Sequence, residues 1–253
     1  MKLALPSDLH LGEPVGRWAA LRRAAGIHDT SHADRARRIV DALLRYPEPL
    51  HVAVLGDSTD RTTERELREM EEVLGAVEKE NLSVVPGNHD CTSVWRMGMG
   101  YDPRAHDACR ESVERLTGRG RFPFARDFGE WRLLCLDSAA HHESGTLFAR
   151  GRIGTRQIAW LAAELADQRP TVVALHHYPA PVNATLAISD ADDLLAVCNR
   201  DHVTLVNGHR HRAGVYPATH SRPRIITACS SVQTMRVRIL DPVTGEWEWL
   251  HIK

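Results

Sequence analysis

Residues 82–90 have the sequence LSVVPGNHD, a mostly apolar run that stops at a proline and continues into three polar residues, Asn88, His89 and Asp90. A short apolar run closed by Pro86-Gly87 is typical of a buried strand that ends in a turn. Open α/β sheets place their ligands beyond the carboxyl ends of their strands. The three polar residues therefore occupy a position where an α/β protein carries its chemistry.

Four other predicted strands end in the same kind of polar cluster. The clusters contain Asp8 and His10 after residues 2–5, Asp57 and Asp60 after residues 51–55, His176 and His177 after residues 171–175, and His209 and His211 after residues 203–206. Each cluster alone has a simple structural explanation, such as a turn, a solvated loop or a helix cap at Asp60. Short motifs give many false positives when they are judged singly. Five strand ends that all carry side chains able to bind metal are better explained by one functional site at one edge of the sheet.

The pattern between these clusters predicts the remaining elements. Apolar residues recur at helical spacing in 33–46, 63–80, 158–165 and 190–200, and further strands are indicated at 131–136, 225–227, 235–240 and 247–252. Residues 91–125 are rich in Arg, Gly and Pro, which favours loops and a short helix above the sheet. Alternating strands and helices are typical of an α/β domain with a largely parallel sheet. No helix is expected in the strand-like tail, and its strands could add a second sheet to the first.

Composition restricts the partners and the compartment. Lys and Arg number 32 against 33 Asp and Glu, so there is no overall basic field and no strong nucleic-acid signal. No apolar run reaches the length of a membrane span, and the first residues lack the apolar core of a signal peptide. The five cysteines form no C-x-x-C pair, which indicates reduced thiols and a cytoplasmic location. Nothing in the sequence indicates an oligomeric state.

The polar clusters form an ordered series that resembles the signature of the calcineurin-like metallophosphoesterases. The series is Asp8-x-His10, Gly56-Asp57-x-x-Asp60, Gly87-Asn88-His89-Asp90, His176 and Gly208-His209-x-His211. The motifs are modest singly but specific as an ordered set, and they cover most of the chain. The resemblance implies an α/β fold with two facing mixed β-sheets flanked by helices, a four-layer αββα sandwich. It also implies a single domain over residues 1–253, with 91–125 as a loop-rich segment near the active site.

The resemblance further implies two transition-metal ions that share Asp57 as a bridging carboxylate. The ligands of one ion would be Asp8, His10, Asp57 and His211, and those of the other would be Asp57, Asn88, His209 and either His176 or His177. We favour His176, because the first His of such His-His blocks is the usual ligand in small phosphodiesterases of the family. His177, directly before Tyr178, is the alternative. Mixed nitrogen and oxygen ligation without cysteine suits divalent or trivalent Mn, Fe, Zn or Co.

The catalytic residues implied by the resemblance are Asn88, His89 and Asp90. His89 would be the acid–base group and Asp90 would orient it, whereas the alternative is that His89 only packs beneath its loop. The expected reaction is in-line attack by a metal-bridging hydroxide on a small phosphodiester, with nucleotides among the candidate substrates. The alternatives are a phosphomonoesterase or nuclease on the same dinuclear site, and a non-enzymatic metal-binding scaffold. The scaffold is less favoured because every ligand position is filled.

Overall fold

The computed structural model describes residues 1–12, 31–92, 100–139, 150–179 and 187–253, and two β-sheets form its centre. The five-stranded sheet has the order β11-β10-β1-β2-β3, with β1 Lys2–Leu5, β2 Leu50–Val54, β3 Leu82–Val84, β10 Arg236–Leu240 and β11 Trp247–His251. The six-stranded sheet has the order β4-β5-β6-β7-β9-β8, with β4 Phe124–Asp127, β5 Arg132–Cys135, β6 Thr171–Ala174, β7 Val203–Asn207, β8 Gly214–Tyr216 and β9 Arg224–Thr227.

Both sheets are mixed, with a parallel centre and antiparallel flanks. Strands β1, β2 and β3 run parallel, and β10 lies antiparallel against the free side of β1. In the second sheet β5, β6, β7 and β9 are parallel, whereas the edge strands β4 and β8 are antiparallel to their neighbours. The parallel strands of each sheet therefore deliver their following loops to one edge.

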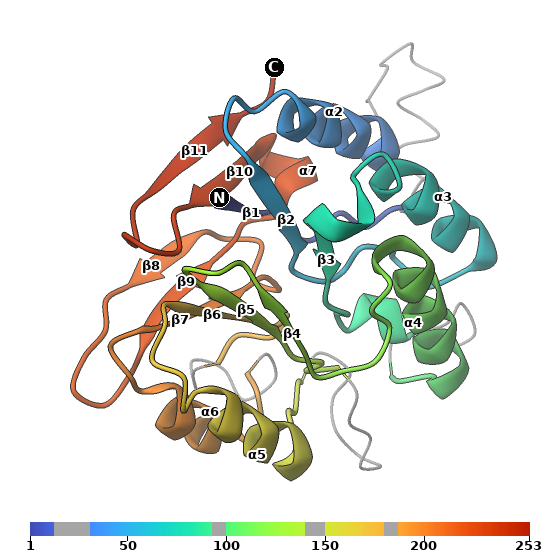
Figure 1. The fold of residues 1–253 in the computed structure, drawn as a ribbon. Helices are drawn as coiled ribbons and strands as arrows, with labels where there is room; N and C mark the ends of the chain where they lie inside the picture. Colours follow the sequence, from blue (N-terminus) through green and yellow to red (C-terminus); the bar gives the residue numbers. More distant parts are fainter. Residues whose placement is uncertain (13–30, 93–99, 140–149, 180–186) are drawn as a thin grey trace.

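Helices cover the outer face of each sheet (Figure 1). The helices are α2 His32–Leu44, α3 Glu64–Leu74, α4 Pro103–Thr117, α5 Thr155–Glu164, α6 Ala191–Cys198 and α7 Ser231–Thr234, with the short 3₁₀ turns η1 Lys79–Asn81 and η2 His89–Cys91. Helices α2, α3 and α4 pack on the five-stranded sheet, and α5 and α6 pack on the six-stranded one. The expected four-layer αββα sandwich is thus confirmed.

Strand alternation explains why the two sheets stack. In β1, Leu3 and Leu5 contribute to the apolar layer between the sheets, whereas Ala4 contributes to the layer beneath the helices. Successive side chains of a strand point to opposite faces, so both faces of this strand are apolar and both are buried. The strand ends therefore rest on a packed scaffold from which their loops project.

The segment 91–125 differs from the expectation of loops with a short helix. It contains α4, a helix of 15 residues that begins with Asp102 as its cap and ends at Gly118, whose φ is 68°. Polar residues outnumber apolar ones in α4, yet Ala105, Cys109, Val113 and Leu116 form one buried stripe. The backbone N–H of Asp102 donates to the carbonyl of Cys91 at 2.8 Å, which ties α4 to η2. Residues 93–99 lie outside the described part of the chain.

A further difference concerns a short element. The tail contains α7, a four-residue helix, where no helix was expected.

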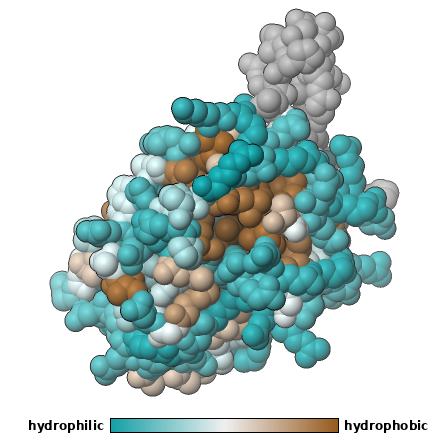
Figure 2. All heavy atoms as spheres, turned by 45° about the horizontal axis from the view of Figure 1, so that its top comes forward, coloured by the Kyte–Doolittle hydropathy of each residue, from teal (hydrophilic) through white to brown (hydrophobic). Residues whose placement is uncertain are grey.

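Among the residues that the structure describes, no helix is long and apolar enough to cross a bilayer. Figure 2 shows a largely hydrophilic face with one hollowed apolar area. The large apolar side chains that are exposed in the described residues are Met1, Leu44, Val243 and Trp247.

Candidate active site

The polar clusters after the strands meet in one place, where both sheets present the carboxyl ends of their parallel strands. Asp8 and His10 follow β1, Asp57 and Asp60 follow β2, Asn88 to Asp90 follow β3, His176 follows β6, and His209 and His211 follow β7. Three groups in this site bring their possible ligand atoms within 4.8 Å of one another: Asp8 with His10 and His211, Asp57 with His176 and His209, and His10 with Asp60 and His89. The first two groups combine side chains from both sheets, whereas the third comes from the loops of the five-stranded sheet.

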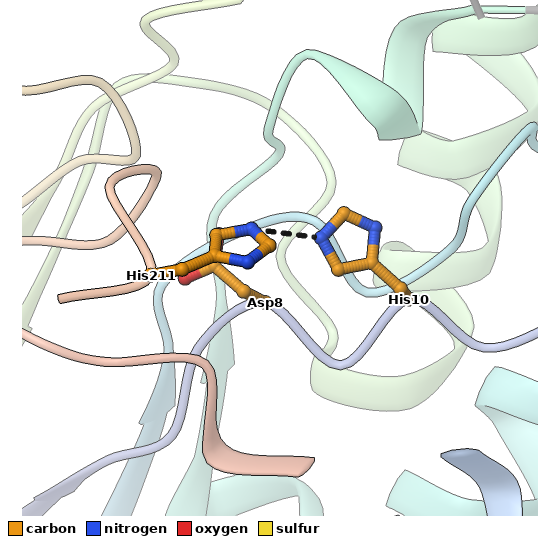
Figure 3. A group of neighbouring side chains, drawn as sticks. All are labelled: Asp8, His10 and His211. Atoms are coloured by element: carbon orange, nitrogen blue, oxygen red, sulfur yellow. Dashed lines mark hydrogen bonds and ion pairs between the residues drawn. The ribbon is translucent and has the colours of Figure 1, made fainter. Parts of the chain in front are cut away.

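The first group consists of Asp8, His10 and His211 (Figure 3). Nε2 of His10 lies 3.2 Å from Nε2 of His211, which in turn lies 3.3 Å from Oδ1 of Asp8. The other carboxylate oxygen of Asp8 accepts a hydrogen bond from the Ser7 hydroxyl at 2.5 Å. Two ring nitrogens and a carboxylate oxygen thus converge on one point.

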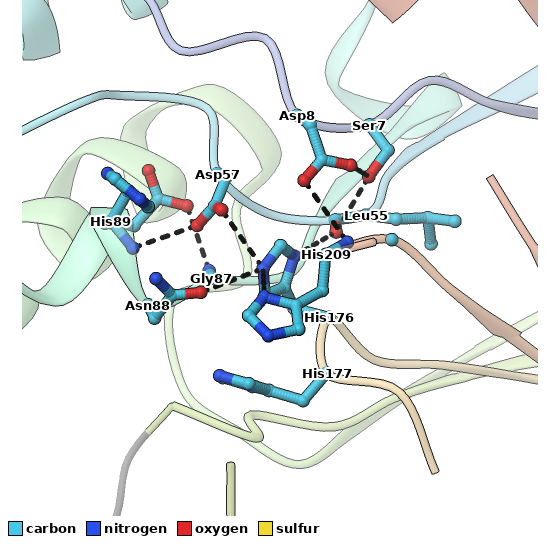
Figure 4. A network of polar contacts seen from close by, with 12 residues as sticks. Ser7, Asp8, Leu55, Asp57, Gly87, Asn88, His89, His176, His177 and His209 are labelled. Carbon is cyan, nitrogen blue, oxygen red and sulfur yellow. Dashed lines mark hydrogen bonds and ion pairs between the residues drawn. The ribbon is translucent and has the colours of Figure 1, made fainter. Parts of the chain in front are cut away.

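The second group is centred on His176 (Figure 4). Its Nε2 lies 3.2 Å from Oδ2 of Asp57, 3.2 Å from Oδ1 of Asn88 and 3.1 Å from Nδ1 of His209. The other ring nitrogen, Nδ1, donates a hydrogen bond to the carbonyl of Leu55 at 2.7 Å. That bond places the proton of the neutral ring on Nδ1 and leaves a lone pair on Nε2, which is how metal-binding histidines are commonly held.

Asp57 lies between the two groups. Its Oδ2 is 3.2 Å from His176 Nε2 and 3.9 Å from His10 Nε2, and its Oδ1 accepts the backbone N–H of His89 at 2.9 Å. The carboxylate is buried; burial disfavours its charge, but His176, His89 and His10 hold its pKa well below the usual range. An ionised carboxylate facing both groups is what a bridging ligand requires.

The donor chemistry fits cations. Around His176 Nε2, lone pairs of nitrogen and oxygen approach to about the distance of a hydrogen bond, and such atoms repel unless a proton or a cation lies among them. Nitrogen and oxygen donors without thiolates suit Mn, Fe, Zn or Co. The seven predicted ligands, Asp8, His10, Asp57, Asn88, His176, His209 and His211, are therefore brought together in a site able to hold metal; their assignment as ligands stays a prediction.

The structure brings His176, and not His177, to Asp57. The ring of His177 is turned away, with Nδ1 2.8 Å from the hydroxyl of Ser138. Neighbouring residues at a strand end point in opposite directions, so only one of the two adjacent rings can reach the carboxylate. Ser138, which follows β5, had not been singled out, because no short motif marks it.

The ligand loops have unusual backbone conformations. Five of the predicted ligands have positive φ angles: Asp8 52°, His10 45°, Asp57 51°, His209 70° and His211 52°. Such angles are uncommon outside glycine and concentrate at functional sites, where the surroundings must hold them. The loops also pack closely, since a Cβ atom on Gly87 would come within 2.2 Å of Asp57 Oδ1. Glycine at position 87 is therefore needed for the approach of the β2 and β3 loops.

The carboxylate beside His89 is that of Asp60, so the expectation that Asp90 orients His89 is wrong. Nδ1 of His89 donates to the carbonyl of Asp60 at 2.9 Å and lies 3.4 Å from its Oδ1. Asp90 instead accepts hydrogen bonds from the loop atoms Ser58 N, Thr59 N, Thr59 Oγ1 and Gly87 N. It braces the β2 and β3 loops, because their amides need an acceptor in a buried place.

Asp60 is a site residue that the helix-cap explanation obscured. The N-cap of α3 is Thr63, so the carboxylate of Asp60 is not used there. It lies 3.7 Å from His10 Nδ1 as well as beside His89. Burial raises the pKa of Asp60, but the two imidazoles outweigh burial and lower it below the usual range. The signal that could have identified Asp60 was its place in the Gly56-Asp57-x-x-Asp60 motif.

Curated relatives of this chain are phosphodiesterases by name. A probable cyclic nucleotide phosphodiesterase of Rhodococcus erythropolis is 31% identical over 62% of this chain and 49% of its own length. A 3′,5′-cyclic-nucleotide phosphodiesterase of Nostoc sp. is 27% identical over 84% of this chain and 72% of that protein. A Psychrobacter relative named as a probable cyclic nucleotide phosphodiesterase is matched over 27% of its length. The chain thus spans less than two thirds of two of these relatives.

Solved structures and the family profile agree on the fold. Protein TT1561 of Thermus thermophilus superposes with a TM-score of 0.58 at 11% identity, over 100% of this chain and 99% of that one. At this identity the likeness concerns the fold alone. The profile of the calcineurin-like phosphoesterases matches residues 1–213, which contain every predicted ligand. Together with the ordered motifs and the two sheets, this match shows that the chain belongs to the calcineurin-like phosphoesterase family.

Proposed function

We propose that this protein is a metal-dependent hydrolase of small phosphodiesters. The observation that carries the proposal is the buried carboxylate of Asp57, which faces two groups of nitrogen and oxygen donors while its other oxygen holds the backbone of His89. The family and the names of the curated relatives support the same reaction class.

Each ligand residue has a defined task in this proposal. Asp8, His10 and His211 hold one cation, Asn88, His176 and His209 hold the other, and Asp57 contributes to both. Two bound cations, drawn from Mn, Fe, Zn or Co, would supply positive charge for the phosphoryl oxygens and lower the pKa of water. The residues would orient the ester at the edge where the strands of both sheets end, and their fixed rings would keep the geometry without rearrangement during the reaction.

His89 is the proposed proton donor to the leaving oxygen. Because Nδ1 donates to the Asp60 carbonyl, the ring orientation is set and Nε2 is the nitrogen that would carry the transferable proton. Burial lowers the pKa of His89, but the neighbouring carboxylates of Asp57 and Asp60 outweigh burial and raise it to about 10. Asp60 is the positioning residue, in place of Asp90.

Small diesters, with cyclic nucleotides first, are the proposed substrate class. The relatives' names point to cyclic nucleotides, and a net charge of −1 offers no general attraction for a nucleic-acid polyanion. The metal-binding residues alone do not determine whether such a site prefers diesters or monoesters, so the assay must include both classes of ester.

The test is a substrate panel with protein stripped of metal by chelation and then reloaded. We expect no turnover after stripping and recovery with Mn, Fe, Zn or Co. Cyclic nucleotides and bis(p-nitrophenyl) phosphate should be cleaved faster than nucleoside monophosphates and p-nitrophenyl phosphate. Asp57→Asn is the matched control and should not recover. Faster cleavage of the monoesters would replace the diesterase by a phosphomonoesterase, and full turnover in stripped protein would refute metal dependence.

A further inference from the structure

His209 is held differently from the other histidines of the site. His176 anchors its second ring nitrogen on the Leu55 carbonyl at 2.7 Å, and His10 faces the carboxylate of Asp60 with its second nitrogen at 3.7 Å. His209 presents Nδ1 to His176, while its Nε2 is buried and has no hydrogen-bond partner among the described residues. A metal-binding histidine is normally oriented by such a partner. The orientation of His209 must therefore come from packing.

The ring that packs against His209 is that of His177 (Figure 4). The two ring centroids are 4.7 Å apart with an interplanar angle of 49°, and His177 also meets His176 edge-on at 5.1 Å and 84°. His177 is completely buried. On another side it contacts Gly151, where an added Cβ would come within 2.5 Å of the His177 ring. The ring of His177 thus packs against the rings of His176 and His209 and against the backbone of Gly151.

Ser138 fixes the orientation of His177, because its hydroxyl group makes every hydrogen bond that a hydroxyl can make. Its Oγ accepts the backbone N–H groups of His176 at 3.3 Å and His177 at 3.2 Å, and lies 2.8 Å from His177 Nδ1. A hydroxyl has one proton and two acceptor lone pairs. Both lone pairs are used by N–H groups, which can only donate. The hydroxyl proton must therefore go to His177 Nδ1, which acts as the acceptor.

We propose that Ser138 and His177 are positioning residues for His209, and that they set the affinity of one of the two cation sites without touching the cation. This inference rests on the proposed metal site and concerns the half formed by Asp57, Asn88, His176 and His209. The other half has a serine of its own, since the Ser7 hydroxyl donates to Asp8 at 2.5 Å. Ser7 therefore provides the comparison for the other half, although its hydroxyl also lies 3.3 Å from the Leu55 carbonyl that accepts from His176.

The experiment compares Ser138→Ala with Ser7→Ala in crystals soaked at limiting Zn²⁺, with the occupancy of each position measured by anomalous diffraction. Ser138→Ala should weaken binding at the His176 and His209 position by about 10–100-fold, as loss of an outer hydrogen bond does elsewhere. Occupancy at the Asp8 and His211 position should stay unchanged. Ser7→Ala should weaken binding at the Asp8 and His211 position more than at the His176 and His209 position, because its shorter hydrogen bond is to Asp8. Calorimetric titration of Zn²⁺ in solution checks that both affinities follow the crystal occupancies.

A second substitution protects the test against a variant that does not fold. His177→Phe keeps a flat buried ring but cannot accept from Ser138, and it should weaken the same half in the same direction. Equal losses at both positions, or no loss in Ser138→Ala, would overturn the proposal. The readout contains no substrate, so two-site binding with this selectivity in a protein that cleaves no ester would refute the proposed function and leave this inference standing.

Discussion

Asp60 and Asp90 belong to the same pair of loops but act on different atoms. Asp60 faces the rings of His10 and His89, whereas Asp90 accepts hydrogen bonds from amides and a hydroxyl of the loops themselves. Asp60 is partly exposed and Asp90 is fully buried. The first carboxylate therefore contacts side chains of the proposed site, and the second mainly contacts the backbone that carries them.

Replacing each of the two carboxylates should separate activity from stability. Asp60→Ala should lower turnover by about 10–100-fold with little change in stability, since the His89 contact to the backbone carbonyl remains. Asp90→Ala should lower the free energy of unfolding by about 3 kcal/mol or more, because several buried donors lose their acceptor. Turnover of bis(p-nitrophenyl) phosphate and urea unfolding measure the two effects. Equal loss of stability in both variants would contradict this division.

His89→Ala tests the proposed proton donor. An ester of a poorly acidic alcohol needs a proton on its leaving oxygen, so turnover should fall by about 10²–10⁴-fold. A nitrophenolate departs without a proton, and its ester should lose much less. Metal content and melting temperature should stay near those of the unchanged protein. A common loss for both esters would assign His89 to charge stabilisation, and loss of metal or of folding would favour the packing alternative.

At the scale of elements, periodicity predicted the strands that carry the site better than it predicted the edge strands of the six-stranded sheet. The strands β1, β2, β3, β6 and β7 were expected within a residue or two of their observed bounds, because each is an apolar run closed by a turn. The edge strands β4 and β8 were not expected: Phe124–Asp127 lies in a segment dominated by Arg and Gly, and Gly214–Tyr216 is short and only half-buried. Edge strands bury less, so they need less of the apolar pattern.

His51 in β2 links stability to pH. It is completely buried, with Nε2 2.9 Å from the Ser83 hydroxyl, and burial together with Arg126 lowers the pKa of His51 to about 3. The unfolded chain binds this proton at about pH 6.5. Its contribution to stability is therefore complete above pH 6.5 and is lost as the pH falls toward 3. Between pH 7 and pH 5, the free energy of unfolding measured in urea should fall less in His51→Gln than in the unchanged protein. An equal fall in both proteins would contradict this.

The β10–β11 hairpin contains a buried charge without a carboxylate. The Arg238 guanidinium, 2% exposed, stacks between Trp247 at 3.9 Å and Trp249 at 4.5 Å, and its Nε and Nη1 have no partner among the described residues. Burial and the neighbouring Arg236 lower the pKa of Arg238 to about 10.

Arg238→Met should therefore leave the free energy of unfolding equal to or above that of the unchanged protein, because an apolar side chain of similar length avoids the desolvation of an unpaired charge. Trp249→Ala is the comparison: it removes a half-buried ring on which both Arg236 and Arg238 stack and should cost about 1–2 kcal/mol. Guanidinium chloride unfolding measures both. A large loss in Arg238→Met would mean that the stacking of the cation outweighs its burial.

At the scale of the whole molecule, the site could be predicted more completely than the topology that assembles it. Every predicted ligand lies in the site because each follows a strand directly, and that relation is local in the sequence. The division into two sheets is not local: β1 pairs with β10, so that Leu3 lies opposite Leu240, and no pattern within either strand records the partner. The resemblance to a family supplied the two sheets. For the same reason Ser138, which reaches His177 from another strand end, could not be predicted.

The predicted ligands come from both sheets, so bound metal should act as a cross-link of the whole molecule. Asp8, His10 and Asp57 follow strands of one sheet, and His176, His209 and His211 follow strands of the other. A ligand that binds only the folded state adds about 2.7 kcal/mol of stability at 100 times its dissociation constant. For a chain of this size that corresponds to roughly 5–10 °C in melting temperature per site. We therefore expect chelation to lower the melting temperature by at least this amount, as measured by calorimetry.

Asp57→Asn, which removes the carboxylate that faces both groups, should melt at the same temperature with and without Zn²⁺ or Mn²⁺. A chelator-insensitive melting temperature in the unchanged protein would show that the two sheets are not joined through metal, and a full metal response in Asp57→Asn would end its assignment as the shared ligand.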